Sequence, residues 1–105
     1  MVEMTATVIF LHPYYKTQMV FNSISEGNWI ETKDNYDKLS SAKQDRVQKY
    51  LSGYANWIKN QYAAGEITYD KAAASFDAIN SIDESGTLYS TYMTEINKNE
   101  YVKTI

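Results

Sequence analysis

The sequence predicts an α+β fold in which a small N-terminal antiparallel β meander packs on an antiparallel helical hairpin. Three observations lead to this prediction. The first third of the chain is rich in β-branched and aromatic residues and is interrupted by turn residues. The middle third repeats its apolar residues with the period of a helix. Gly65 and Thr68 then mark the end of one helix and the start of the next.

The N-terminal strands are expected over residues 5–11 and 19–24, with a short third strand over residues 28–32. Pro13 separates the first two strands, because its ring restricts its own φ and disfavours helical geometry in the residue before it. The Glu-Gly-Asn sequence around Gly27 is typical of a turn.

The clearest element is a long amphipathic helix running from about Asp34 to Ala64. At about 100° per residue, one arc collects a set of large side chains, and polar residues occupy the opposite side. The set consists of Val47, Tyr50, Leu51, Tyr54, Trp57, Ile58 and Tyr62. Whether the helix starts at Asp34 or restarts at Ser40 or Ser41 stays open, because both serines are suitable N-caps.

A second helix is expected to begin after Thr68, with Asp70 in its first turn, where negative charge favours the helix dipole. The short connection through Gly65 predicts an antiparallel hairpin. The tail has two alternatives. A third C-terminal helix over residues 88–97 with an extended end is favoured, whereas a hairpin in residues 88–105 would turn at residues 97–100. The whole chain, residues 1–105, is interpreted as one domain.

Composition excludes several kinds of site. The chain has 105 residues, 44% of them hydrophobic and 22% charged, and no cysteine, which removes disulfides, zinc–thiolate sites and iron–sulfur ligation. His12 is the only histidine, and no glycine-rich phosphate loop or nucleophile elbow is present. We therefore expect no enzyme activity, no cofactor and no metal site. The absence of an export signal and of a long apolar segment predicts a cytoplasmic protein without membrane contact.

Charge is distributed unevenly along the chain. Residues 33–59 carry six basic and three acidic side chains, whereas residues 60–105 carry three basic and seven acidic ones. Lys43, Arg46 and Lys49 on the long helix form an alternative nucleic-acid-binding face. The net charge of −3 argues against nucleic acid as the main partner, as does the placement of the nearby aromatic rings on the buried arc.

The unusual feature is ten tyrosines and two tryptophans against three phenylalanines. Tyr14, Tyr15, Trp29 and Tyr36 lie in or beside predicted turns, where no periodic pattern buries them. Tyrosine and tryptophan are enriched at protein interfaces. These four residues are therefore predicted to bind a partner, although a tyrosine-rimmed core would explain the composition without one.

The predicted function is a small non-enzymatic protein that docks to a larger protein, as an inhibitor, adaptor or assembly subunit. Its small size and lack of catalytic motifs extend this hypothesis to viral anti-host or anti-defence proteins. Pairing of two copies as a homodimer remains an alternative use of the same rings.

Overall fold

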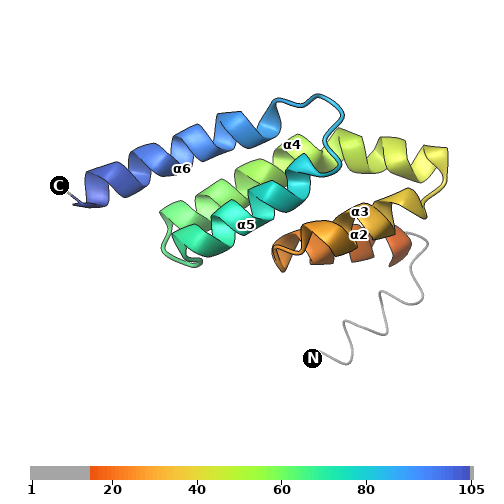
Figure 1. Ribbon diagram of the computed structural model, residues 1–105, viewed down its shortest axis with the longest axis horizontal. Helices are drawn as coiled ribbons and strands as arrows, with labels where there is room; N and C mark the ends of the chain where they lie inside the picture. Colours follow the sequence, from red (N-terminus) through yellow and green to blue (C-terminus); the bar gives the residue numbers. More distant parts are fainter. Residues whose placement is uncertain (1–14, 105) are drawn as a thin grey trace.

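The structure is a computed structural model that describes residues 15–104 (Figure 1). This part of the chain is built from helices and contains no strand. The helices are α2 (Tyr15–Ser25), α3 (Trp29–Asp37), α4 (Ser41–Ala63), α5 (Tyr69–Asn80) and α6 (Leu88–Thr104).

The predicted α+β class is therefore wrong, because the β meander is not present. Residues 19–24 lie within α2, residues 28–32 form the cap and first turn of α3, and residues 5–11 lie outside the described residues. The buried residues of α2 include Val20 and Ile24, which are four residues apart and share one helical face. Burial of this face against neighbouring helices overrides the β propensity of the individual residues.

The turn predicted around Gly27 does exist, but it joins two helices. Gly27 has φ +72°, a conformation that glycine adopts without steric cost. The amide of Asn28 donates to the carbonyl of Ser23 at 3.1 Å, which closes the end of α2. The side chain of Asn28 then accepts from the Glu31 amide at 3.0 Å and caps α3. One compact turn thus ends α2 and starts α3.

The long helix begins at Ser41, so a single helix from Asp34 to Ala64 is wrong and the restart is correct. Ser40 is the N-cap, and its hydroxyl accepts from the Lys43 amide at 3.4 Å. Asp34 belongs instead to α3. At the other end, Gly65 directly follows the C-cap residue Ala64 and has φ +80°. Gly65 thus ends the helix, as the sequence predicts.

Helix α5 lies at the centre of the molecule, where it packs against α2, α3, α4 and α6 (Figure 1). Thr68 caps it by accepting from the Lys71 amide at 3.1 Å, and α5 returns beside α4 to form the helical hairpin. Phe76, at 0% exposure, is its largest buried side chain. A single cluster of buried side chains drawn from all five helices makes up the core of the described residues.

The C-terminal segment is helical through Thr104, and Ile96 buries it against α4 and α5. The helix predicted over residues 88–97 is thus present and longer than expected. The extended end and the alternative hairpin turn at residues 97–100 are both wrong.

None of the helices in residues 15–104 has the length and apolar character needed to cross a bilayer.

Candidate functional site

The four rings predicted to bind a partner do not share one environment. Trp29, the first residue of α3, is 54% exposed. Tyr36, near the end of the same helix, is buried at 6% exposure, and Tyr15 at the start of α2 is half-buried. Tyr14 lies outside the described residues. Of the predicted set, only Trp29 presents most of a ring to solvent within residues 15–104.

Tyr36 is a structural residue. Its hydroxyl donates to the Glu84 carboxylate at 3.3 Å and accepts from the Gln48 side chain at 2.9 Å. Burial raises the pKa of Tyr36, and the hydrogen bond from Gln48 partly opposes this effect. Gln48 also donates to the Ile82 carbonyl at 2.6 Å. Tyr36 therefore joins α3 to α4 and to the loop before α6, and its ring is not available to a partner.

Three aromatic residues of α4 that belong to the predicted apolar arc are only partly covered by the neighbouring helices. Tyr50 is 56% exposed, Trp57 is 49% exposed and Tyr54 is half-buried. Their spacing of four and three residues puts them on one flank of the helix. The buried face of α4 consists instead of Val47, Leu51, Ala55, Ile58 and Tyr62. The arc assigned to the core from the sequence is thus wider than the face that its neighbours cover.

This flank continues onto α2. The ring centroids of Phe21 and Tyr54 are 4.9 Å apart, and those of Tyr54 and Trp57 are 5.3 Å apart. The Tyr54 hydroxyl donates to the Phe21 carbonyl at 3.2 Å and shares a hydrogen bond with the Ser25 hydroxyl. Burial raises the pKa of Tyr54, and the hydrogen bond with Ser25 partly opposes this effect. We call Phe21, Tyr50, Tyr54 and Trp57 the aromatic stripe.

Two of the three predicted nucleic-acid-binding residues extend the aromatic stripe towards the start of α4. Lys43 and Arg46 precede Tyr50 by seven and four residues and lie on the same flank, where both are half-buried. Lys49 is exposed and lies about 100° from Tyr50 around the helix axis. Lys49 therefore does not extend the aromatic stripe, although it follows Arg46 by three residues.

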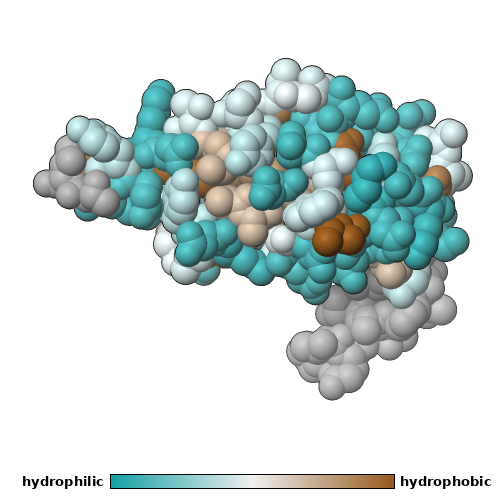
Figure 2. Space-filling model, viewed as in Figure 1, coloured by the Kyte–Doolittle hydropathy of each residue, from teal (hydrophilic) through white to brown (hydrophobic). Residues whose placement is uncertain are grey.

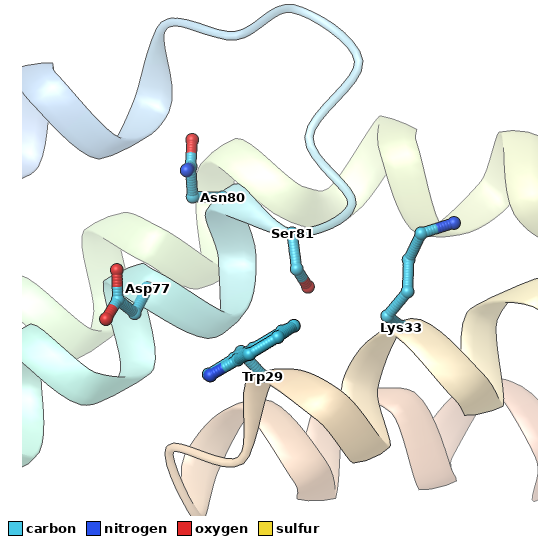
Figure 3. A pocket seen from close by; sticks show the side chains of 5 residues that line it. All are labelled: Trp29, Lys33, Asp77, Asn80 and Ser81. Carbon is cyan, nitrogen blue, oxygen red and sulfur yellow. The ribbon is translucent and has the colours of Figure 1, made fainter.

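A second surface feature is an open cleft of about 460 Å³ between the start of α3 and the end of α5 (Figure 3). Its lining residues are Trp29, Lys33, Asp77, Asn80 and Ser81. The indole ring forms one wall, and the three residues of α5 and its C-cap form the other. The ammonium of Lys33 extends away from the ring, and it contacts the Asp37 carboxylate at 2.7 Å.

The face drawn in Figure 2 is mostly hydrophilic, apart from a compact hydrophobic spot near α3 and a paler strip between α5 and α6. No group of acidic or histidine side chains within residues 15–104 is placed to hold a metal ion. His12 lies outside the described residues. The candidate sites on the described residues are therefore the aromatic stripe and the Trp29 cleft.

Sequence reasoning placed Tyr50 and Trp57 on the apolar arc of the long helix, and it did not connect Asp77 with Trp29. The exposure of Tyr50 and Trp57 could have been predicted from the width of this arc, which is broader than the apolar face that a surface helix usually buries. No local signal links Asp77 to Trp29.

Comparison with known protein families, with curated proteins and with solved structures found no match.

Proposed function

We propose that the protein acts by docking to a larger protein through the aromatic stripe, as an inhibitor, adaptor or assembly subunit. The observation that carries this proposal is the exposure of Tyr50 and Trp57 beside the supported ring of Tyr54. Large aromatic side chains held in place by their neighbours lose little conformational entropy on binding, and they dominate interface energetics.

The form of the stripe supports one continuous contact. Phe21 and Tyr54 fix the rings on α2 and α4 relative to each other, because the Tyr54 hydroxyl is tied to the α2 backbone. Lys43 and Arg46 add positive charge at one end of the stripe. A partner that presents an apolar centre with carboxylates to one side would complement both features.

Affinity capture with matched variants tests this proposal. We expect Tyr50→Ala/Trp57→Ala to lose a partner that the unaltered protein retains, with affinity lowered at least about thirtyfold, because a hot-spot residue contributes about 2 kcal/mol or more. The control is Ile30→Ala/Val102→Ala, which removes side chains that are 64% and 65% exposed and lie outside the stripe. Circular dichroism verifies that both variants remain helical. Equal retention of the partner by both variants would refute the stripe as the interface.

Nucleic-acid binding is a second candidate because one observation favours it. Tyr50 is exposed on the same flank as Lys43 and Arg46, which combines a stacking ring with phosphate-binding cations. The net charge of −3 still weighs against it. A fluorescence-anisotropy titration with a single-stranded oligonucleotide decides between the two candidates. Binding that weakens steeply with salt and is lost in Lys43→Ala/Arg46→Ala would favour nucleic acid over protein.

Pairing of two copies through the stripe is a further outcome that can be separated from binding to a different protein. Sedimentation at two concentrations of the purified protein measures it directly. A concentration-dependent dimer that is lost in Trp57→Ala would identify a second copy of the chain as the occupant of the stripe. A monomer at both concentrations would rule out a second copy of the chain and favour a different protein as the partner that binds the aromatic stripe.

A further inference from the structure

The Trp29 cleft contains a carboxylate that nothing in residues 15–104 neutralises. Asp77 is exposed on α5, and no ion pair or hydrogen bond from the described residues reaches its side chain. Lys33, the cation that also lines the cleft, is held by Asp37 through contacts of 2.7 and 3.0 Å. The charge that the cleft offers to a ligand is therefore negative.

The end of α5 increases this negative character. Asn80 is the last residue of the helix and Ser81 is its C-cap, so the carbonyl groups of the last turn are directed towards this end. The helix dipole places partial negative charge there, and α5 has no basic residue in its last turn to offset it. The Ser81 hydroxyl donates to the Ala78 carbonyl at 2.6 Å, so its oxygen is left as an acceptor facing the cleft.

The opposite wall is an aromatic face. The indole of Trp29 lies across the cleft, with the Ser81 side chain above it and Asp77 to one side (Figure 3). A tryptophan ring attracts a cation placed over its face, more strongly than tyrosine or phenylalanine does. Asn28 caps α3 directly before Trp29, so the backbone that carries the ring is fixed by a hydrogen bond of 3.0 Å.

From these three features we propose that the Trp29 cleft binds the guanidinium group of an arginine side chain. The planar group would stack on the indole of Trp29 and donate two N–H groups to the Asp77 carboxylate. Guanidinium is the cation that combines stacking on an aromatic face with bidentate pairing to a carboxylate. A lysine ammonium could make only one of these contacts well, and an anion would be repelled by Asp77 and by the end of α5.

An arginine on a docked protein would be the natural source of this group. In that respect the inference extends the proposed docking function, adding a second contact on a surface formed by α3 and α5. The site itself can be tested without any protein partner. A failure of the cleft to bind arginine would therefore leave the result for the aromatic stripe unaffected, and the converse also holds.

The probe is arginine blocked at both ends as N-acetyl-arginine N-methylamide, titrated at low salt into the full chain labelled with ¹⁵N. The protein has two tryptophans, Trp29 and Trp57, so its spectrum contains two indole N–H signals. The Trp57→Phe variant assigns them. We expect the Trp29 signal to shift along a saturable curve with a dissociation constant on the order of millimolar. The Trp57 signal serves as an internal control and should remain in place.

Two comparisons make the test specific. The equally blocked citrulline has the same shape but no charge, and we expect at least about tenfold weaker binding. Asp77→Asn should weaken arginine binding by a similar factor. Asp70→Asn removes an exposed carboxylate from the first turn of the same helix and should have no effect.

The proposal is overturned by any of four results. These are the absence of a saturable shift at Trp29, an equal shift with citrulline, unchanged affinity in Asp77→Asn, or equal binding of blocked lysine. A Trp57 signal that follows the same curve as the Trp29 signal would also count against a defined site.

Discussion

Substituting Gly27 with alanine should destabilise the protein more than the same substitution at Gly65. Both glycines have positive φ, +72° and +80°, so alanine at either position costs about 1–2 kcal/mol in the left-handed region. At Gly65, a β carbon would meet nothing within 4 Å. At Gly27 it would lie 2.6 Å from the Cβ of Ala74 on α5, which is attached to the backbone and cannot move aside cheaply. Overpacking of this kind costs about 1–3 kcal/mol more.

Equilibrium unfolding in urea, followed by circular dichroism, measures both free energies. We expect Gly27→Ala to lose about 2–5 kcal/mol and Gly65→Ala about 1–2 kcal/mol. Combining Gly27→Ala with Ala74→Gly removes the opposing methyl group, and it should recover the steric part despite the cost of a helical glycine. Equal losses at the two glycines, or no coupling with Ala74→Gly, would refute the close approach of the α2–α3 turn to α5.

Three further predictions concern the core and one cap. Burial, assisted by the hydrogen bond to Glu100, raises the pKa of Tyr62 above the ordinary tyrosine value of about 10, so at high pH the folded state keeps a proton that the unfolded chain loses. The contribution of Tyr62 to the free energy of unfolding should therefore be fully present below about pH 10 and be lost at higher pH. In urea titrations, Tyr62→Phe should make the decrease in the free energy of unfolding above pH 10 shallower by up to about 1.4 kcal/mol per pH unit. Parallel curves for the two proteins would contradict this. Phe76→Ala should cost about 3–5 kcal/mol in the same assay, and half-buried Phe21→Ala clearly less; equal losses would contradict the placement of the core. Asn28→Ala should cost about 1 kcal/mol and increase amide hydrogen exchange in the first turn of α3, and unchanged exchange would show that the cap is unimportant.

The helix ends of the central hairpin could be predicted because their chemistry is local. Ser40 and Thr68 cap α4 and α5 through bonds to amides three residues further on, and Gly65 supplies the positive φ that ends α4. Each of these features depends on a few consecutive residues and on backbone sterics. The same reasoning left the start of α4 open, because it could not show that the chain turns between Lys38 and Ser40.

The N-terminal helices could not be predicted because local and tertiary preferences conflict there. Thr17, Val20 and Ile24 are β-branched and favour strands locally, yet they are buried on one face of α2 at spacings of three and four residues. Helices α3 and α5 cover that face. Packing against helices that are distant in sequence therefore decides between helix and strand here. The residues within a window of ten do not contain this information.

The candidate sites depend on the same non-local information. Helix α4 is covered by α5 and α6, whereas its contact with α2 is slight, so one flank remains open around Tyr50 and Trp57. Trp29 and Asp77 are 48 residues apart and line one cleft because α3 packs on α5, beside the place where the turn at Gly27 lies against Ala74. The residue types were visible in the sequence, but their proximity was not.

The tyrosine content has a structural explanation that changes how its functional meaning should be argued. Four hydroxyls connect different elements: Tyr36 reaches Glu84, Tyr54 reaches the α2 backbone, and Tyr62 and Tyr69 reach Glu100 and Asn97 on α6. A tyrosine at the edge of a small core can bury its ring and still satisfy its hydroxyl on a neighbouring helix. An abundance of tyrosine is therefore no measure of surplus rings. The docking proposal depends instead on the two rings of the aromatic stripe that the described helices leave most exposed, Tyr50 and Trp57.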